Sequence, residues 1–477
     1  MEKSMVNFSS VKLFFSSRLI LLKRKIGSLL KKETINKMYS ENSKKSIYLH
    51  NRTDIFIIIL VFVLLINPVI FNAVSRLIAK SRQKDIYLST RCEEIFGGKT
   101  IKTLVKEFEK QNPNLRIKLL NVPGEKGREP DILFFDEGEF NGLAAEGDLL
   151  PLGSFSEAEN GVQNLAIPLV SFMDLLFFNI ELLQTAGFDR PPKTRDEFLA
   201  CAKTISAADK GILAEAAGAA MALSPANKHA LSRDIFSWIW AAGGNFWSNE
   251  DSSAPVINTR QIINDFNFLV RLYREEALSP KSSSVPQNQA LSPNSFEMTE
   301  EQALDDFAQG KIAMLIASTR AIPALREKMG DDAFGITTIP GAGTAGKYNV
   351  SLTGVFAGIN KKCVYPGAAW VFLDFLAAQS PLFCAQLKAV PGYVPELLST
   401  DNKNYIKEDP FYAKAWDIFE SSVVVRGFLG VPGAQEYENA VREEIRLFFE
   451  GTSTAQETVN AIQRRWDGVF ASSVPKW

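Results

Sequence analysis

Three acidic residues follow an apolar stretch in the first third of the 477-residue chain and are the clearest candidates for chemistry. The stretch is PDILFFDE, which ends at Asp136 and Glu137, and Glu139 lies two residues further on. Carboxylates bind hydroxyl groups and cations, and a suitably spaced pair can also hydrolyse a glycosidic bond. In an open α/β sheet the loops after the strands point into the ligand crevice, so these acids are predicted to face a ligand. An acidic turn that faces solvent remains the alternative.

A second group of candidates combines aromatic rings with glycine. Trp238, Trp240 and Trp247 offer flat apolar faces that can stack on a sugar ring. Spacings of two and seven residues do not place all three on one helix face, so at least one is predicted to lie in the core, and Trp240 and Trp247 are preferred as ligand contacts. Gly244 either lets the backbone approach the ligand closely or ends the helix.

Residues for other kinds of catalysis are scarce. The two histidines, His50 and His229, build neither a triad nor a metal cluster, and the chain has no G-x-S-x-G, P-loop or H-E-x-x-H motif. The four cysteines are Cys92, Cys201, Cys363 and Cys384. They form no C-x-x-C pair and have no histidine nearby, so no metal site and no cofactor are predicted. Buried free thiols are expected, with a bridge between Cys363 and Cys384 left open.

Charge is distributed unevenly along the chain. Residues 1–54 hold 12 Lys/Arg and 4 Asp/Glu, whereas residues 85–477 hold 37 bases and 50 acids and have a net charge of −13. An acidic main body argues against a nucleic-acid partner, which requires clustered positive charge.

An uncharged apolar run separates these two parts. The 20 residues IFIIILVFVLLINPVIFNAV are long enough to span a hydrocarbon core of roughly 30 Å. Residues 55–75 are therefore predicted to form an uncleaved transmembrane signal anchor, with 1–54 as a basic cytoplasmic tail. The chain is expected at the cell membrane as a single-pass protein whose main body is extracytoplasmic, either periplasmic or extracellular.

The elements that must position the candidate residues follow an α/β pattern. A strand at 86–89, a helix at 100–108 and strands at 115–122 and 131–135 predict a parallel sheet with right-handed crossovers. Further strands are predicted at 166–170, 175–179, 312–316, 335–339 and 354–360. Further helices are predicted at 143–147, 181–186, 299–308, 368–378, 411–420, 436–449 and 455–469, together with one that begins after Thr194.

Several stretches, in this order, resemble the extracellular solute-binding proteins of ABC importers, specifically the maltose-binding-like branch. They are PDILFFDEGEFNGLAAEGDLLPL, AIPLVSFMDLLFFNIELLQTAGFDRPPKTRDEF, FSWIWAAGGNF, FAQGKIAMLIASTRAIPAL, FGITTIPGAG and GVFAGINKK. With the helical tail they cover nearly all of residues 85–477. The resemblance implies an α/β, two-lobed periplasmic-binding-protein-like fold, preceded here by one transmembrane helix. It also implies ABC permease subunits as partners and a small-molecule ligand, a mono- or oligosaccharide, that is bound by hinge closure and not hydrolysed.

The resemblance also suggests where the lobes meet. Three hinge crossings are expected, near 170–174, 351–356 and 377–382. Lobe 1 would then comprise 85–170 with 355–378, and lobe 2 would comprise 171–354 with 379–477.

Four more ligand contacts follow from the same resemblance. Arg320 follows a strand where the family often places a ligand-facing residue, but maltose binders have an aromatic residue there. Its guanidinium suits a carboxylate or phosphate of the ligand, or an acid of the cleft. Phe172 stands where those binders offer a carboxylate, so both residues argue against maltodextrin itself. Tyr393 and Tyr437 are weaker candidates for the core or the rim of the cleft.

Two other functions remain open at this point. The first is a surface glycosidase that uses Asp136 and Glu139 as its carboxylate pair. The second is a membrane-anchored ligand sensor that signals through its anchor and basic tail.

Overall fold

The computed structural model describes residues 83–90, 98–120, 128–154, 165–227, 232–247, 254–273, 289–341, 348–387, 390–391, 408–425, 427–429 and 431–473. The expected basic tail, the expected transmembrane segment at 55–75, Cys92 and Tyr393 lie outside these residues. Among the helices that the structure does describe, none is long and apolar enough to cross a membrane. Residues 82–477 form one compact unit.

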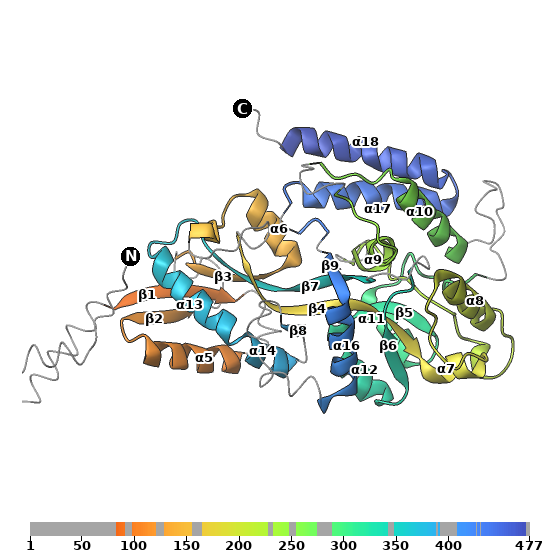
Figure 1. Ribbon diagram of the computed structural model, residues 1–477, viewed down its shortest axis with the longest axis horizontal. Helices are drawn as coiled ribbons and strands as arrows, with labels where there is room; N and C mark the ends of the chain where they lie inside the picture. The colour runs from red at the N-terminus through yellow and green to blue at the C-terminus, as the bar shows by residue number, and fades with distance from the viewer. Residues whose placement is uncertain are drawn as a thin grey trace, which may run out of the picture. The chain divides into compact units, whose positions relative to one another are not determined.

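The strands described form one mixed sheet (Figure 1). They are β1 (Lys84–Thr90), β2 (Leu115–Leu120), β3 (Ile132–Asp136), β4 (Ile167–Asn179), β5 (Met314–Ser318), β6 (Phe334–Thr337), β7 (Tyr348–Ile359), β8 (Val390–Pro391) and β9 (Ser422–Val425). The main path through the sheet is β2-β1-β3-β7-β4-β5, with β6 and β8 also paired to β4 and β9 paired to β7. The predicted parallel pairing is confirmed for β1 with β2 and with β3. β7, by contrast, runs antiparallel to β3 and β4.

The α-helices described pack around this sheet. They are α5 (Gly98–Gln111), α6 (Glu137–Ala145), α7 (Ile180–Thr185), α8 (Arg195–Ser206), α9 (Ser237–Ala241), α10 (Arg260–Tyr273), α11 (Glu300–Ala308), α12 (Ile322–Met329), α13 (Pro366–Ala378), α14 (Ser380–Leu387), α16 (Pro410–Ser421), α17 (Ala434–Glu450) and α18 (Ala455–Ser473). The predicted caps are present, because the Thr194 side chain accepts a hydrogen bond at the start of α8 and Thr299 forms a capping box at the start of α11.

β3 is buried on both faces, which explains its apolar sequence. Ile132 and Phe134 contribute to the core beneath α5 and α13, which lie side by side in Figure 1. Leu133 and Phe135 point the opposite way, into a cluster formed with Phe140 of α6. A strand enclosed in this way is held firmly, so the turn that follows it is a rigid place for ligand-binding side chains.

Helices α9, α10, α12 and α14 were not predicted, and two predicted elements have different bounds in the structure. The stretches 166–170 and 175–179 belong to one 13-residue strand, β4, because the polar Ser171 and Asp174 between them are buried within the strand instead of forming a turn. Helix α6 begins at Glu137, several residues before the expected start at 143, because Asp136 caps it.

The hydrophobic interior falls into two groups of clusters, here called the N-terminal core and the C-terminal core. The N-terminal core is built from β1–β3, α5, α6, α13 and α14, and the C-terminal core from α7–α12, β5, β6 and α16–α18. β4 passes from one to the other between Phe172 and Met173. β7 does the same between Leu352 and Val355.

Two adjacent residues before α17 enter different cores. Phe428 stacks on Tyr437 at 5.0 Å between ring centroids and contacts Trp466 at 5.2 Å, within the C-terminal core. Leu429 belongs instead to the cluster of Phe140 and Phe356 in the N-terminal core. This short segment therefore connects the two cores at a point remote in sequence from β4 and β7.

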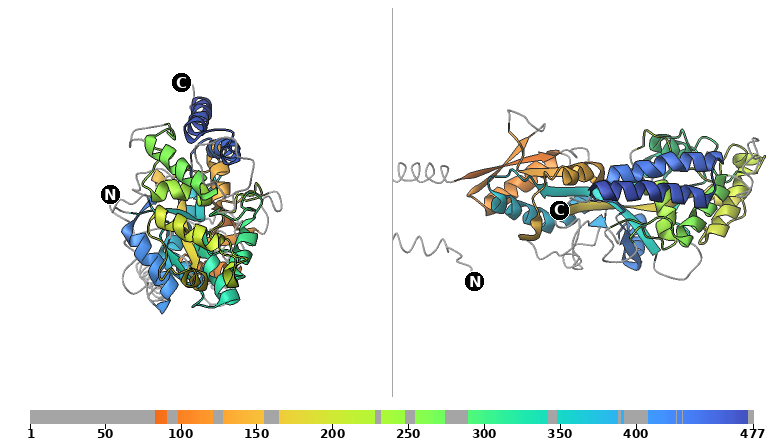
Figure 2. Two further views of the ribbon diagram at one scale, coloured as in Figure 1. Left: turned by 90° about the vertical axis from the view of Figure 1, so that its right-hand side faces the viewer. Right: turned by 90° about the horizontal axis from the view of Figure 1, so that it is seen from above.

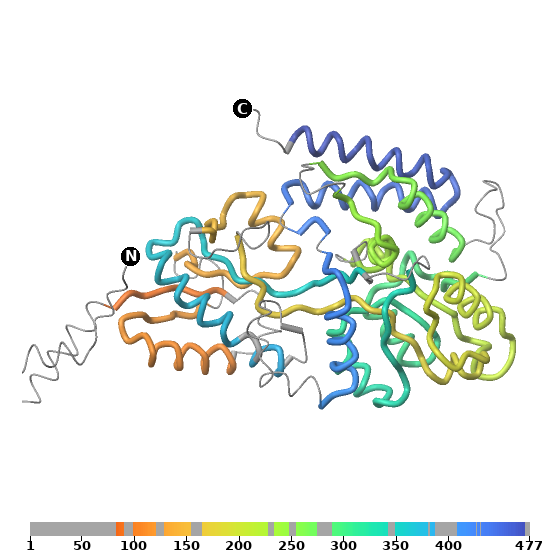
Figure 3. Tube along the Cα trace, in the orientation of Figure 1, coloured from red at the N-terminus to blue at the C-terminus, as the bar shows by residue number. Residues whose placement is uncertain are grey.

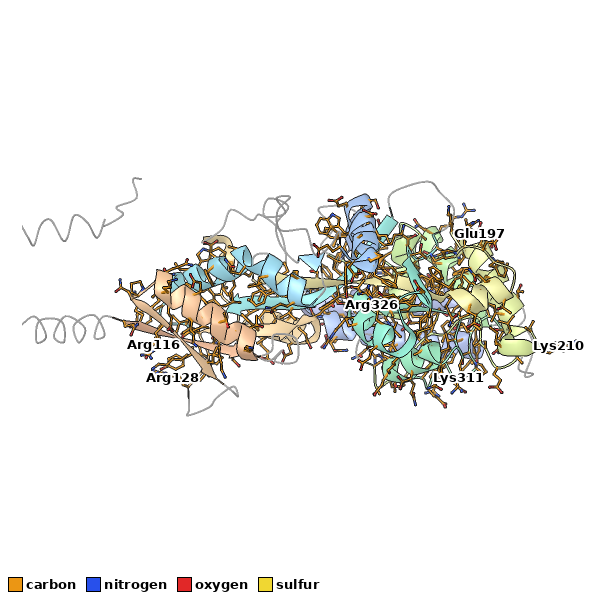
Figure 4. All side chains as sticks on the ribbon, turned by 90° about the horizontal axis from the view of Figure 1, so that it is seen from below. Arg116, Arg128, Glu197, Lys210, Lys311 and Arg326 are labelled. Carbon is orange, nitrogen blue, oxygen red and sulfur yellow. The ribbon has the colours of Figure 1, made fainter. Side chains whose placement is uncertain are left out.

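The last two helices cover the C-terminal core as an antiparallel pair, as the view from above in Figure 2 and the tube in Figure 3 show. Trp466 of α18 is fully buried, and its indole N–H donates a hydrogen bond of 2.9 Å to the Tyr437 carbonyl of α17. Arg326 of α12, labelled in Figure 4, donates to the carboxylate of Asp409, the N-cap of α16, at 2.7 Å. Of the cysteines described, Cys201, Cys363 and Cys384 are free thiols.

Candidate ligand-binding site

A cavity of about 130 Å³ lies where β4 and β7 pass from one core to the other. Its described walls come from the β3–α6 turn, β4, β7, the end of β5, α11, the π-helical segment Ser232–Phe236 and the 3-10 turn Thr319–Ala321. The lining residues are Asp136, Glu137, Phe172, Asp174, Arg233, Glu300, Ser318, Arg320, Thr353 and Gly354. Residues from both core groups thus converge on one site.

The β3–α6 turn provides two carboxylates. Asp136 ends β3 and caps α6, because its Oδ1 accepts the backbone N–H of Glu139 at 2.9 Å. Glu137 is the first residue of α6, and its Oε2 is buried without a hydrogen-bond partner from the described ranges. The order apolar strand, aspartate, helix therefore fixes both side chains at the cavity wall.

β4 provides a third carboxylate from the opposite wall. Phe172 and Asp174 are two residues apart, so they lie on the same side of the strand. The Asp174 side chain is almost fully buried, at 2% exposure, and accepts a hydrogen bond from Ser351 of β7. Its Oδ2 has no hydrogen-bond partner among the described residues.

Arg233 is the buried cation of the site. It comes from the π-helical segment Ser232–Phe236 and pairs with the neighbouring Asp234 at 2.8 Å and with Glu300 of α11 at 2.7 Å. Its charge also acts on Asp174. One guanidinium therefore serves three carboxylates, which leaves an excess of negative charge in this wall.

Arg320 and Glu300 mark the outer boundary of the cavity. Both also line a larger groove of about 730 Å³ between α11 and α12. Arg320 is held in a short 3-10 turn after β5, in which Ser318 accepts its backbone N–H at 3.3 Å. The groove continues the cavity, so a ligand longer than one sugar ring has a path outward.

A glycine brings the two long strands together at the cavity floor. Gly354 of β7 pairs with Ser171 of β4, and a Cβ at residue 354 would lie 2.3 Å from the Val170 carbonyl oxygen. Any side chain here would push the strands apart. Next to it, Thr353 offers its side chain to the cavity.

The structure places only part of the predicted ligand set at this cavity. Asp136, Glu137, Phe172 and Arg320 line it, whereas Glu139 does not. Trp238 and Trp240 are 1% exposed and Tyr437 is equally buried, so all three are core residues with no ring face open to a sugar. Trp247 packs edge-on against Phe428 at the border of the same core.

Gly244 has a local structural role. A Cβ at this position would lie 2.6 Å from the Ile239 side chain and 2.8 Å from its carbonyl oxygen. Its backbone N–H donates to that carbonyl, after Gly243 has ended α9 with a positive φ of 83°. The helix-ending interpretation of the two glycines is therefore the one that the structure supports.

Sequence reasoning missed several members of the site. Asp174, Arg233, Glu300, Ser318, Thr353 and Gly354 were not among the predicted contacts. Asp174 carried a usable signal, because it is the one charge in the apolar strand IPLVSFMDLLFFN. It also supplies a carboxylate two residues from Phe172, on the face where the resemblance leads us to expect one.

Burial dominates the electrostatics of the two opposing carboxyl groups. Burial raises the pKa of Asp174 to about 7, although the nearby Arg233 lowers it. Burial also raises the pKa of Glu137 to about 8, and the charges of Asp174 and Glu438 add to that increase. Both groups therefore hold protons well above the pH at which an exposed carboxyl group loses them.

Replacing Asp174 with asparagine is expected to reduce the pH dependence of stability. Between about pH 4 and pH 7 the native Asp174 retains a proton that the unfolded chain has lost, so native stability falls as the pH rises. The variant cannot ionise and should gain about 1–4 kcal/mol over the unchanged protein by pH 7. Urea unfolding across this range measures the difference.

A matched control is Asp196→Asn in α8, whose target side chain is 86% exposed. This change should leave the slope of stability against pH as it is. Equal slopes for the unchanged protein and Asp174→Asn would contradict the prediction.

Comparison with known proteins agrees with this architecture. The family model described as bacterial extracellular solute-binding protein matches residues 97–380. Among solved structures, the cyclic alpha-maltosyl-1,6-maltose binding protein from Arthrobacter globiformis superposes with a TM-score of 0.65 at 16% identity, covering 82% of this chain and 100% of that one.

Two further structures show the same fold. A maltose-bound protein from T. maritima gives a TM-score of 0.57 at 18% identity, covering 80% of this chain and 99% of that one. An ABC substrate-binding protein from Listeria monocytogenes in complex with cycloalternan gives a TM-score of 0.56 at 16% identity, covering 82% of this chain and 99% of that one. At these identities the likeness establishes the fold, whereas the family match extends over more than half of the chain. The chain belongs to the family of bacterial extracellular solute-binding proteins.

Proposed function

We propose that the protein is the solute-binding component of an ABC importer and that it binds a saccharide in the cavity between β4, β7 and the β3–α6 turn. The observation that carries the proposal is that elements of both the N-terminal core and the C-terminal core place polar side chains in this one cavity. The solved neighbours are described as binding cycloalternan, maltose and mannotriose, which supports a saccharide as the ligand class.

The ligand contacts that we propose are the residues brought together at the cavity. Asp136, Glu137 and Asp174 accept hydrogen bonds from ligand donors, and Arg320 donates to ligand acceptors at the entrance to the groove. Phe172 offers the apolar surface that the buried tryptophans do not. Further sugar units would follow the groove between α11 and α12.

Binding would work by closure of two lobes around the ligand. The expected lobes were 85–170 with 355–378 and 171–354 with 379–477, joined at three crossings. We propose the same division except that α14 belongs to the first lobe, because Phe383 and Cys384 pack in the N-terminal core. β4 and β7 support the first two crossings, since each has one half in each core. A ligand that contacts both lobes favours the closed state by its difference in affinity for the two states.

We further propose that residues 55–75 anchor the chain in the cell membrane, with the binding domain outside and the basic residues 1–54 inside. The uncharged apolar run and its basic flanks support this part of the proposal. ABC permease subunits would then receive the ligand from the anchored domain.

The alternative functions are not favoured. A glycosidase that uses Asp136 and Glu139 would need both carboxylates at the ligand, and only Asp136 lines the cavity. No specific contact supports a sensor. The protein is proposed to bind its ligand without turning it over.

A thermal-shift screen tests the proposal. The full chain, purified in a detergent without a sugar headgroup, is heated with monosaccharides and oligosaccharides, with sugar acids, and with peptides and metal ions for comparison. A true ligand at about 100 times its Kd should stabilise the native state by about 2.7 kcal/mol without producing new reducing ends. Stabilisation by peptides or metal ions alone would contradict the saccharide assignment, and new reducing ends would point to a glycosidase.

A further inference from the structure

The cavity is more acidic than the recognition of a neutral sugar requires. Its described lining holds four carboxylates, Asp136, Glu137, Asp174 and Glu300, and two guanidinium groups, Arg233 and Arg320. Two more carboxylates act on it from behind the wall, Asp234 next to Arg233 and Glu438 from α17. The negative groups outnumber the positive ones three to one among these residues.

The buried guanidinium of Arg233 does not compensate for this excess of acidic groups. The hydrogen bonds of Arg233 go to Asp234, and its remaining ion pair goes to Glu300. None of them reaches the Oδ2 atom of Asp174, which is buried and has no hydrogen-bond partner in the described part of the chain. The Asp174 side chain is 98% buried, so bulk solvent has little access to it.

The wall formed by the β3–α6 turn also lacks a hydrogen-bond donor for one of its carboxylate oxygens. Glu137 also has a buried carboxylate oxygen, Oε2, to which no residue that the structure describes donates a hydrogen bond. The charged groups that act on it, Asp174, Glu438 and Asp136, are all acidic. Two incompletely bonded carboxylates from different elements thus line one cavity and repel each other.

The chemistry of the ligand determines whether it can supply the missing hydrogen-bond donors and the missing positive charge. A sugar hydroxyl donates one hydrogen bond but carries no charge that would compensate the ionised form of either carboxyl group. An ammonium group supplies three N–H donors and a full positive charge, and its hydrogen bonds to carboxylates are about twice as strong as neutral ones. Among the described lining residues the only aromatic ring is that of Phe172, so stacking contributes little to selectivity.

We propose that the ligand is a saccharide that carries a protonated amino group, and that this ammonium lies between the carboxylates of Glu137 and Asp174. This inference builds on the proposed function and narrows its ligand to amino sugars. Arg320 lines the groove next to this cavity, where further units of the ligand would lie.

The test uses three disaccharides that share one carbon skeleton. They are the free diamine of chitobiose, its N,N′-diacetyl form and cellobiose, and each is titrated into the full chain by calorimetry. The amine is expected to bind at least about ten-fold more tightly at pH 7 than either neutral sugar. Pairs of monosaccharides, such as glucosamine and glucose or mannosamine and mannose, extend the comparison to other ring stereochemistries.

Proton release gives a second readout. Because Glu137 and Asp174 hold protons in the empty site, an ammonium that pairs with them must displace those protons. The heat of binding should therefore depend on the ionisation enthalpy of the buffer, and the affinity should rise from pH 6 to pH 7. A neutral sugar releases no protons by this route, and its affinity should not rise with pH.

Two isosteric variants locate the ammonium. Glu137→Gln and Asp174→Asn should each remove the preference for the amine and lower its affinity about ten-fold, with little loss for a neutral sugar. Glu139→Gln is the matched control, because Glu139 belongs to the same helix but does not line the cavity. Thermal unfolding of each variant confirms that it is folded before titration.

The outcomes separate this inference from the proposed function. If a neutral sugar binds as tightly as its amine counterpart, or if both isosteric variants keep the preference, the amino-sugar inference is wrong and sugar binding stands. If putrescine, an amine without a sugar ring, binds as tightly as the amino sugars, the saccharide assignment is wrong. If no sugar of either kind binds, both proposals are wrong.

Discussion

Replacing Arg233 with methionine is expected to lower the free energy of unfolding by about 3–5 kcal/mol at neutral pH, because breaking a buried ion pair from one side leaves uncompensated charge. Arg233 is 4% exposed and faces the carboxylates of Asp234, Glu300 and Asp174. Without the guanidinium, Asp234 and Asp174 must either take up protons or stay charged in a site that already disfavours their ionised forms.

The loss of unfolding free energy in Arg233→Met should increase with pH. At about pH 4 Asp174 is protonated in the native state, so removing the cation leaves less unpaired charge. The destabilisation is therefore expected to grow as the pH rises toward 8. Urea unfolding of the variant and the unchanged protein at both ends of this range measures it.

A surface pair provides the control. Arg190 makes a bidentate ion pair with Glu197, but the two side chains are 54% and 41% exposed. Arg190→Met should cost at most about 1 kcal/mol, because solvent takes over the exposed charges. Equal losses for Arg190→Met and Arg233→Met would contradict the role assigned to burial.

Replacing Phe428 with alanine is expected to lower the free energy of unfolding about as much as Arg233→Met does. Its ring stacks on Phe246 at 5.5 Å and on Tyr437 at 5.0 Å, and it meets Trp466 edge-on at 5.2 Å. Phe428→Ala removes the middle ring of this cluster and leaves a cavity, so a loss of about 3–5 kcal/mol is expected in urea unfolding.

The adjacent residue allows the two cores to be examined separately. Leu429 is 5% exposed and packs with Phe140 and Phe356 in the N-terminal core. Leu429→Ala should cost about 2–5 kcal/mol. Because the two side chains enter different cores, the double variant should lose nearly the sum of the single losses, and a coupling above about 1 kcal/mol would contradict this separation.

The control for this pair lies on α17. Leu447 is 44% exposed, so Leu447→Ala should change stability by no more than about 0.5 kcal/mol. A large loss at Leu447 would mean that truncation of leucine, and not burial in a core, explains the effect at Leu429.

Local patterns predicted the regular elements well. The alternation and helical spacing at 86–120 correspond to β1, α5 and β2, and the late amphipathic runs correspond to α13, α16, α17 and α18. These patterns were readable because each helix buries one stripe and each strand has a period of two. The predicted break between 170 and 175 was wrong, because nothing local to Ser171 and Asp174 shows that tertiary contacts bury them.

The candidate site was predicted only in part, and for a physical reason. Asp136 and Glu137 were found because a strand end followed by acids is a local signal. Trp238 and Trp240 were both candidates for stacking on the ligand, because an aromatic ring that fills a core has the same sequence signature as one that contacts a sugar. Only the packing around them shows that both rings are 1% exposed.

The sequence by itself therefore determined the α/β class, the acidic main body and the turn that carries Asp136 and Glu137. Tertiary structure decided that Asp174, Arg233 and Glu300, which lie more than 35 residues after that turn and far from one another in sequence, share a wall of the same cavity. The physical reason is that composition and period are properties of a single segment. Whether an acidic group finds a partner, in contrast, depends on which segments pack together. The fold brings Glu137 and Asp174 to one cavity and so gives the site its excess of acidic groups.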